Sequence, residues 1–336
     1  MSSIALTGGG TAGHIMPNLA LLPELCKYFE KIIYIGGDGM ERDLVPKYGI
    51  KFFSTSVVKL NRSNLLQNAK IPFVLNKGIK EAKNILQSAH IDVVFSKGGY
   101  AALPACFAAK SLKIPVVTHE SDYTMGMANK LISMFAASTL TGFAETKGGT
   151  FVGNPLREEI LKGNAAHAVE KYKLPPRPTV LVFGGSLGAE AINHALEGCL
   201  SALLKEYNIV HITGKNAKKG DSGQGYTRLE FANDIADLYA VADLVVIRGG
   251  ANSLAEAAAL GKRTLCIPLP KGASRGDQLD NAKSYQKTGL LEILEQHSLT
   301  PDSLYSAIQK LIVMPEPAPV YKNVNAVIVK EILKVL

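Results

Sequence analysis

Four glycine-rich segments constrain the fold of this 336-residue chain more than any other feature. Each follows a short β-rich run and precedes a helical pattern, and two occur in each half of the chain; they lie at residues 8–13, 96–100, 184–189 and 248–253. Glycine lets the backbone turn sharply and approach a ligand closely, and the helix that follows presents N–H groups to an anion. Because parallel strands end at one edge of their sheet, the four turns predict one ligand cleft between two facing domains.

Short β-rich runs alternate with helical patterns along almost the whole chain, which is typical of parallel sheets with helical crossovers. The runs expected as strands lie at residues 4–7, 32–35, 51–55, 92–96, 116–119, 138–141, 179–183, 209–213, 228–231, 244–247 and 264–268. A chain of this length exceeds the usual size of one hydrophobic core, so two domains are expected. The predicted fold class is therefore α/β, with two Rossmann-like, doubly wound domains.

Two turn-rich segments predict the domain boundaries. The cluster Gly153-Asn154-Pro155 favours a boundary after the last strand of the first half. The proline-rich segment 315–319 ends a helix and stiffens the chain. Beyond it, apolar residues recur at helical spacing, so a final helix needs an apolar surface, and packing back onto the first domain is one economical solution. The expected domains are residues 1–155 plus 320–336, and residues 156–319.

Composition narrows the class of partner. The formal net charge of +8 favours an anionic partner, but the chain has no tryptophan and no arginine–aromatic cluster, so nucleic acid is not expected. We expect neither a signal peptide nor a membrane-spanning segment, because no apolar run approaches the roughly 18 to 20 residues that cross a bilayer. The four cysteines are widely spaced without a CxxC pair, which predicts reduced core residues in a cytosolic protein.

The first glycine segment on its own leaves several interpretations open. Gly8, Gly10 and Gly13 satisfy GxGxxG, and Asp38 follows the next β-rich run, so a nicotinamide-dependent oxidoreductase is one alternative. A tight turn without a ligand is another. A single dinucleotide-binding fold, however, leaves the two glycine segments of the second half unexplained.

Polar residues near the later glycine segments are further candidates for ligand contacts. Glu256, placed in the first turn of a helix after Gly250, has two acceptor oxygens that suit the two hydroxyls of a ribose. Ser253 and Glu256 also match a capping-box pattern, and the two roles can coexist. Asp277 and Gln278 lie in a polar loop and are expected either to face the cleft or to be a solvated surface.

Seven motifs, taken together and in order, resemble those of the MurG family, the N-acetylglucosaminyltransferases that convert lipid I into lipid II in peptidoglycan synthesis. The motifs occupy residues 9–17, 96–100, 119–121, 153–157, 184–189, 248–256 and 276–282. The resemblance runs from about residue 4 to the end of the chain. It implies a GT-B fold with UDP-GlcNAc as donor, bound mainly by the second domain, and lipid I as acceptor.

The resemblance also implies which residues bind the donor, with Gln278 on the sugar and the backbone near Ala232 on the uracil. The implied contacts are Thr11, Ala12, Gly13, Arg157, Ser186, Ala232, Ala251, Asn252, Ser253, Leu254, Ala255, Glu256 and Gln278. Asp122 stands where some relatives have Asn, and Leu187 replaces a common Gln, which puts those contacts in doubt. Ala12 replaces a glycine but is small enough to keep the turn.

The implied reaction is inverting: a sugar hydroxyl of the acceptor attacks the anomeric carbon of GlcNAc, and UDP leaves. Such a reaction passes through an oxocarbenium-like state and needs a base on the attacking side. His14, whose ordinary pKa is near neutral, and Glu120 are the two candidates, although either could serve only as a helix cap, a phosphate contact or an ion-pair partner. No cofactor or metal is expected, because no Asp-x-Asp cluster lies beside the loops and helix N-termini can stabilise the leaving diphosphate.

An apolar segment beside lysines predicts where a lipid-linked acceptor would be reached. Residues 71–75 are apolar, and the neighbouring positions add further lysines and aliphatic residues, namely Lys70, Lys77, Lys80, Lys83, Leu65, Leu66, Ile79 and Leu86. A core-packed helix with a solvated face is the alternative. The resemblance favours a peripheral protein on the cytoplasmic face of the bacterial cell membrane, with an anionic membrane surface and other cell-wall synthesis proteins as partners.

Two further functions stay open. Another UDP-sugar-dependent lipid glycosyltransferase, such as a diacylglycerol glycosyltransferase, would share the donor loops and differ mainly in the first domain. Binding of a nucleotide sugar without catalysis is the second, because Asp122 and Leu187 depart from the family pattern.

Overall fold

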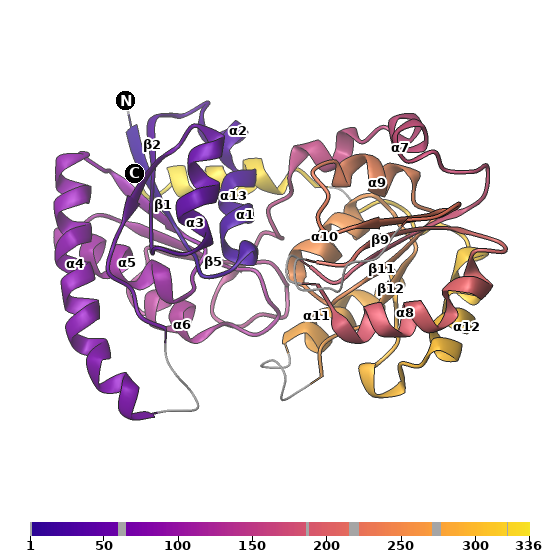
Figure 1. Cartoon of the computed structure of the whole chain (residues 1–336). Helices are drawn as coiled ribbons and strands as arrows, with labels where there is room; N and C mark the ends of the chain where they lie inside the picture. The colour runs from indigo at the N-terminus through magenta and orange to yellow at the C-terminus, as the bar shows by residue number, and fades with distance from the viewer. Residues whose placement is uncertain (1, 60–64, 186–187, 215–221, 271–276, 321) are drawn as a thin grey trace. The chain divides into compact units, whose positions relative to one another are not determined.

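The computed structural model describes residues 2–59, 65–185, 188–214, 222–270, 277–320 and 322–336 (Figure 1). The chain divides into two compact units, Met1–Arg157 with Asn323–Leu336, here called unit 1, and Glu158–Lys322, here called unit 2. Each unit is a parallel sheet with helices on both faces, so the predicted α/β class with two doubly wound domains is confirmed.

The described residues of unit 1 form a sheet of seven parallel strands in the order β3-β2-β1-β4-β5-β6-β7. Their bounds are β1 Ser2–Thr7, β2 Phe29–Gly36, β3 Lys51–Ser54, β4 Val93–Ser96, β5 Val116–Glu120, β6 Ser138–Thr141 and β7 Thr150–Phe151. The strand order reverses between β1 and β4, which pair directly with Ile4 opposite Val93. The turns after these two strands, which hold the first two glycine segments, therefore lie at the same edge of the sheet.

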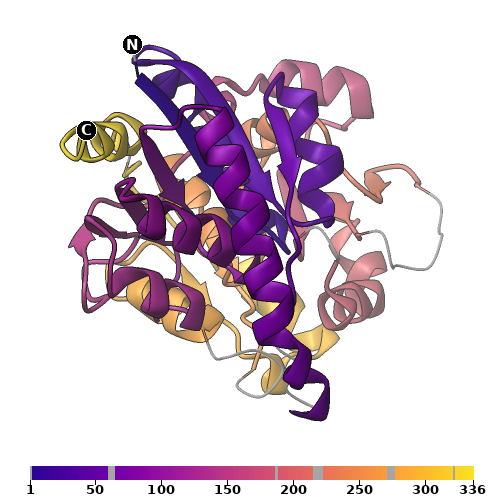
Figure 2. The ribbon, with the colours of Figure 1, turned by 90° about the vertical axis from the view of Figure 1, so that its left-hand side faces the viewer.

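The helices of unit 1 form two layers. They are α1 Ala12–Ala20, α2 Leu22–Leu25, α3 Met40–Leu44, α4 Ile71–Ser88, α5 Leu103–Leu112, α6 Met127–Ser133 and α13 Val324–Leu333, with short 3-10 turns at η1 Val45–Tyr48, η2 Leu65–Lys70 and η3 Tyr100–Ala102. α4, α5 and α6 bury Ala82, Leu86 and Ile132, among others, on one face of the sheet. Figure 2 looks onto this face, with α4 as the long helix in front. Small residues of α5, such as Ala105 and Ala109, let the helix pack closely.

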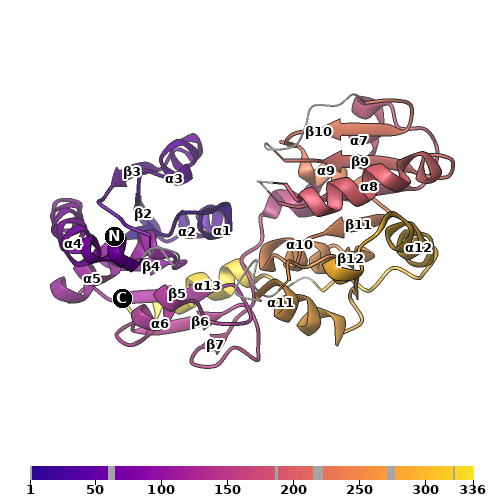
Figure 3. The same ribbon diagram turned by 60° about the horizontal axis from the view of Figure 1, so that its bottom comes forward.

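The last helix, α13, packs on the opposite face of unit 1 beside α2 and β6 (Figure 3). Ile328 and Ile332 are fully buried there. Asn325 fixes the helix, because its Nδ2 donates to the carbonyl oxygens of Ala20, at 3.0 Å, and Leu156, at 2.8 Å. Its Oδ1 accepts a hydrogen bond from the Leu156 N–H at 3.1 Å, so one buried amide joins three segments of unit 1.

In the described part of unit 2, six parallel strands form one sheet in the order β10-β9-β8-β11-β12-β13. Its elements are β8 Thr179–Phe183, β9 Asn208–Ile212, β10 Tyr226–Leu229, β11 Leu244–Ile247, β12 Thr264–Cys266, β13 Glu292–Ile293, α7 Ala165–Tyr172, α8 Glu190–Leu203, α9 Ile235–Val241, α10 Ala251–Ala259, α11 Asp277–Gln286, α12 Pro301–Ile312, η4 Glu158–Lys162 and η5 Gln296–Ser298. α8 and α12 pack on one face of the sheet, and α7, α9, α10 and α11 on the other. Here the order reverses between β8 and β11, so the third and fourth glycine segments also share one edge.

Two strands, β7 and β13, were not expected from the sequence. Each has only two residues at the edge of its sheet, which is too short for a hydrophobic periodicity to mark. None of the described helices is both long enough and apolar enough to cross a bilayer.

Candidate functional site

A cavity of about 680 Å³ opens in unit 2 where the sheet order reverses. The turns after β8 and β11, the start of α8, and the segments before α11 and α12 line it, through Gly184, Gly188, Ala189, Glu190, Ala191, His194, Ala195, Arg248, Leu269, Gln278, Gln296, Leu299 and Pro301. This position, outside the carboxyl ends of the strands at the point of reversal, is where open α/β sheets bind their ligands. The cavity therefore marks the candidate ligand site of unit 2.

Arg248, the residue after β11, gives this cavity its positive charge. Its side chain is largely buried, at 8% exposed, and its Nη1 donates to the carbonyl oxygen of Ile267 at 3.0 Å. Burial lowers the pKa of the guanidinium, which is nevertheless a permanent cation in proteins. No ion pair joins Arg248 to a carboxylate anywhere in the described residues, so its charge is available to an anionic ligand.

Among the predicted donor-binding residues that the structure describes, Gln278 is the one that lines the cavity directly. Its Oε1 accepts a hydrogen bond from the Leu269 N–H at 3.0 Å. The start of α11 lies so close to Gly249 that a Cβ on this glycine would be 2.3 Å from the Gln278 carbonyl oxygen. Asn281 donates to the carbonyl oxygen of Gly249 at 3.0 Å, so α11 and the fourth glycine segment form one structure.

The predicted residues from Ala251 to Glu256 are the first six residues of α10, whose N-cap is Gly250. The capping-box alternative for Ser253 and Glu256 is wrong, because the helix begins before Ser253. Glu256 consequently lies in the second turn, not the first, and it is buried. The side chain of Leu254 belongs to the core, so only its backbone can face a ligand, whereas Asn252 and Ser253 are half-buried.

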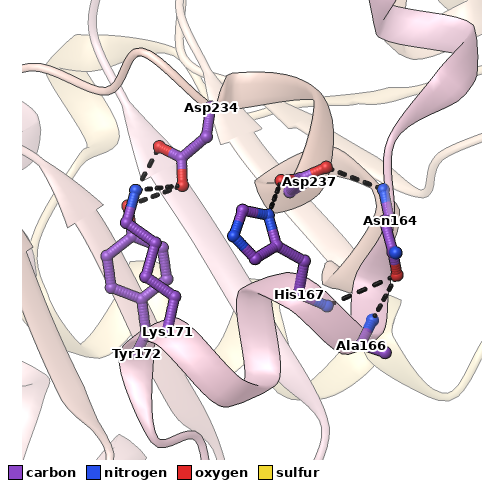
Figure 4. A network of polar contacts seen from close by, with 7 residues as sticks. All are labelled: Asn164, Ala166, His167, Lys171, Tyr172, Asp234 and Asp237. Atoms are coloured by element: carbon purple, nitrogen blue, oxygen red, sulfur yellow. Dashed lines mark hydrogen bonds and ion pairs between the residues drawn. The ribbon is translucent and has the colours of Figure 1, made fainter.

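Ala232 lies in the connection between β10 and α9, which is held by side chains of α7 and α9 (Figure 4). Asp234 accepts hydrogen bonds from Lys171 Nζ at 2.7 Å and from the Tyr172 hydroxyl at 2.9 and 3.0 Å. Asp237 accepts from the Asn164 N–H at 2.7 Å and pairs with His167 at 2.6 Å. These hydrogen bonds lower the pKa of both carboxyl groups, so both aspartates are ionised. The contacts that Asp234 and Asp237 make with α7 and its N-cap are here called the α7–α9 clamp.

Four of the predicted donor contacts, Thr11, Ala12, Gly13 and Arg157, belong to unit 1. Ser186, and Leu187 beside it, lie outside the described residues. The structure thus gathers Gln278 and the start of α10 around the fourth glycine segment. Sequence reasoning did not single out Arg248, which lines the cavity, although a cation directly before Gly-Gly at a strand end was a usable signal.

In unit 1, His14 lies in the first turn of α1, next to the second glycine segment. Its Nδ1 is 3.0 Å from the hydroxyl of Thr11, the N-cap of the helix. A Cβ on Gly99 would be 3.3 Å from the same nitrogen, so this glycine allows the imidazole to approach the backbone. If Nδ1–H donates to Thr11, the lone pair resides on Nε2, which is the tautomer that a base requires.

A buried lysine occupies the position in unit 1 that Arg248 occupies in unit 2, directly before two glycines. Lys97 is 1% exposed, and its Nζ hydrogen bonds to His119 Nδ1 and to the Ser121 hydroxyl, the latter at 2.7 Å. His119 Nε2 donates to the carbonyl oxygen of Gly153 at 2.8 Å, which makes Nδ1 the acceptor. Burial lowers the pKa of Lys97 to about 7 and, together with the lysine's charge, lowers that of His119 well below its ordinary value.

Glu120 directs its carboxylate into its own loop. Oε1 accepts from the Asp122 N–H at 3.0 Å, and Oε2 accepts from the Gly126 N–H at 2.8 Å and Asn129 Nδ2 at 2.9 Å. Three hydrogen bonds to a buried carboxylate organise the connection from β5 to α6. This geometry suits a residue that shapes the loop, including the backbone of Asp122, better than one that removes a proton.

The contacts of Asp38 do not favour the dinucleotide interpretation. Its carboxylate accepts from the Ser54 hydroxyl at 2.7 Å and pairs with Arg42 at 3.5 Å. The N–H of Gly10, which a dinucleotide phosphate would approach, is already bonded to a carboxylate oxygen of Glu41.

The described residues contain no group of three or more His, Cys, Asp or Glu side chains placed to hold a metal ion.

Comparison with known proteins gives concordant results for both units. A model of the glycosyltransferase family 28 N-terminal domain matches residues 4–141, and one of the glycosyltransferase family 28 C-terminal domain matches residues 179–336. A relative from Clostridium novyi, 39% identical over 96% of this chain and 93% of its own length, is named UDP-N-acetylglucosamine–N-acetylmuramyl-(pentapeptide) pyrophosphoryl-undecaprenol N-acetylglucosamine transferase. A relative from Geobacillus kaustophilus with the same name is 43% identical over 92% of this chain and 90% of its length.

Among solved structures, MurG of Acinetobacter baumannii superimposes with a TM-score of 0.75 at 26% identity, covering 99% of this chain and 100% of that one. Similarity therefore extends over both units and over the glycine segments of each.

Proposed function

The chain belongs to glycosyltransferase family 28, and we propose that it transfers GlcNAc from UDP-GlcNAc to the MurNAc 4-hydroxyl of lipid I, with inversion, to give lipid II. The observation that carries the proposal is the identity of about 40% over 96% of the chain with relatives named for this transfer. The fourth glycine segment gives the family assignment a physical basis, because it lies at the reversal point of the unit 2 sheet and leads into the N-terminus of α10, where an anion can bind.

The donor site that we propose combines the cavity of unit 2, lined by Arg248 and Gln278, with the first two turns of α10 and the connection from β10 to α9. Arg248 would face the diphosphate, Gln278 the sugar, and Glu256 the ribose, with the α7–α9 clamp holding the connection around Ala232 for the uracil. The guanidinium and the N-terminus of α10 supply positive potential to the leaving UDP. Because the chain's own groups stabilise this charge, we propose that transfer needs no divalent cation.

For the acceptor side we propose His14 as the base. The acceptor hydroxyl gives its proton to Nε2 while its oxygen forms the bond to C1 of GlcNAc. The bond from C1 to the diphosphate oxygen breaks, and UDP leaves with that electron pair. Glu120 is assigned a positioning role, because its two oxygens already accept three hydrogen bonds within the β5–α6 connection.

Calorimetry separates this function from its alternatives. UDP-GlcNAc and UDP are expected to bind, UDP-glucose more weakly, and NAD not at all, with the same affinities in the presence of EDTA. Tight binding of NAD would support the oxidoreductase instead. Preference for UDP-glucose over UDP-GlcNAc would favour another lipid glycosyltransferase, and loss of UDP binding in EDTA would contradict the metal-independent site.

We further propose that the N-terminal half of α4 associates peripherally with an anionic membrane. Phe73 is 80% exposed, Lys70, Lys77 and Lys80 are exposed beside it, and Ile71 and Val74 are half-buried. The expectation that Leu86 adds to an exposed apolar surface is wrong, because Leu86 is fully buried in the core. Only the first half of the helix presents apolar surface. Ile79 packs against the same core, and the side chains of Leu65 and Leu66 lie outside the described residues.

Replacing Phe73 with serine should weaken binding to vesicles of mixed anionic and neutral lipid about tenfold, because burial of an aromatic side chain contributes about 1.5–3 kcal/mol. Flotation at low and high salt measures this, and salt should weaken the wild type by screening the lysines. Val313→Ser, at a residue of unit 2 that is 79% exposed, is the matched control and should bind as the wild type does. Failure of the wild type to float at low salt would refute membrane association through α4.

A further inference from the structure

A buried carboxylate accepts a hydrogen bond from the backbone of the first glycine segment. Glu41 lies in α3, far from residues 8–13 in the sequence, and its side chain is 1% exposed. Its Oε2 accepts a hydrogen bond from the Gly10 N–H at 3.2 Å, and its Oε1 accepts one from the Gly37 N–H at 3.1 Å. No lysine or arginine of the described chain pairs with it, so backbone N–H groups are what stabilise its charge.

Glycines make room for this carboxylate. A Cβ on Gly9 would be 2.2 Å from Oε1, one on Gly39 would be 2.8 Å from Oε2, and one on Gly36 would be 3.0 Å from Cγ of Glu41. Two of these glycines follow or end β2, and one belongs to the segment after β1. The ends of two neighbouring strands are therefore shaped around a single side chain.

The hydrogen bond between Glu41 and the Gly10 N–H fixes the part of the first glycine segment that leads to His14. Gly10 also packs against the Tyr100 ring, which is 2.6 Å from where a Cβ on Gly10 would be. Gly10 itself has φ +82°, a conformation that favours glycine. The next residue, Thr11, is the N-cap of α1 and contacts the His14 imidazole. A shift at Gly10 would thus displace both Thr11 and His14.

We propose that Glu41 is a positioning residue, an internal anion that fills the place a phosphate would take behind the first glycine segment and so sets the orientation of His14. On this assignment the Gly10 N–H, which is bonded to Glu41, does not bind the donor diphosphate. The part of the segment that meets substrate is at Thr11 and His14. The inference deepens the proposed function and rests on it for the role of His14.

Glu41→Gln tests the proposal, since it keeps the shape of the side chain but sets an amide NH₂ group against one of two backbone N–H groups. We expect kcat for GlcNAc transfer to lipid I to fall about tenfold to a hundredfold, because small displacements of a reacting group are costly. The KM for UDP-GlcNAc and the affinity for UDP should be unchanged, since the donor cavity is in unit 2. Amide hydrogen exchange should increase in residues 8–14 and 36–41 and nowhere else in unit 1.

Asp43→Asn, which removes a charge from an exposed side chain of the same helix, is the matched control and should behave as the wild type in every measurement. Unchanged kcat in Glu41→Gln would overturn the proposal. So would a loss of activity accompanied by faster exchange throughout unit 1, because that would indicate a general role in stability. If the wild type itself transfers no GlcNAc, the proposed function fails, while the exchange measurement still decides whether Glu41 holds the segment.

Discussion

Replacing His14 with alanine is expected to lower kcat for GlcNAc transfer about a thousandfold, an increase of about 4 kcal/mol in the activation free energy. The acceptor hydroxyl would lose the only base that we assign on the attacking side, while the donor cavity of unit 2 stays intact. Steady-state rates with a lipid I analogue measure the loss, and calorimetry should find the wild-type affinity for UDP.

Two companion variants sharpen this test. His297→Ala, at an exposed histidine of unit 2, should leave kcat unchanged. Glu120→Gln should lower kcat less than His14→Ala, since an amide keeps the size of the group but disturbs a loop held by three hydrogen bonds. If His14→Ala and Glu120→Gln both retained wild-type turnover, neither residue would have the role given to it here.

Arg248→Met is expected to weaken UDP binding about a hundredfold without destabilising the protein. Losing one partner of a buried charge pair usually costs about 2–5 kcal/mol of binding free energy. In the ligand-free chain, however, the guanidinium is buried without a carboxylate, and burial lowers its pKa. Replacing it with an apolar side chain should therefore leave the free energy of unfolding unchanged or increase it.

Calorimetry with UDP and thermal unfolding of the same samples measure these two effects. Arg177→Met is the matched control, because Arg177 also lies in unit 2 and donates to a carbonyl oxygen, that of Leu204, at 2.8 Å, but does not line the cavity. It should bind UDP normally. If Arg248→Met lost UDP affinity only in proportion to a loss of stability, the arginine would be structural and the donor diphosphate would bind elsewhere.

Lys97 and Arg248 show how similar segments acquire different roles in the two units. Each follows a strand beside the reversal point and precedes two glycines. Lys97 is enclosed by His119 and Ser121, and burial brings its pKa down to about 7. Arg248 lines an open cavity and cannot lose its charge. The unit with a permanent, accessible cation is the better diphosphate site, in agreement with the assignment of the donor to unit 2.

The fold could be predicted from the sequence because hydrophobic runs and glycine turns are local signals. Eleven runs expected as strands correspond to strands of the two sheets, and among the described residues only the two-residue edge strands β7 and β13 were not predicted. The capping box at Ser253 was wrong for a local reason: Gly250 already begins α10, so the pattern falls inside the helix. The prediction that Leu86 adds exposed apolar surface was wrong for a related reason. Helical spacing shows which residues share a face of the helix, but it does not show how much of that face the rest of the protein covers.

The site was predicted less completely because several of its contacts join distant segments. Nothing in the spacing of Glu41 indicates that its carboxylate reaches Gly10, 31 residues earlier. The hydrogen bonds that Gly126 and Asn129 donate to the Glu120 carboxylate likewise depend on how the β5–α6 connection folds. Such contacts follow from tertiary packing, and they are what distinguish a candidate base from a residue that holds a loop.

The decisive measurement is transfer of labelled GlcNAc from UDP-GlcNAc to a lipid I analogue. We expect a single labelled product with a β-glycosidic bond to the MurNAc 4-hydroxyl, one UDP released for each GlcNAc transferred, and a rate that falls about a thousandfold in His14→Ala. Absence of transfer to lipid I, or transfer to diacylglycerol in its place, would contradict it.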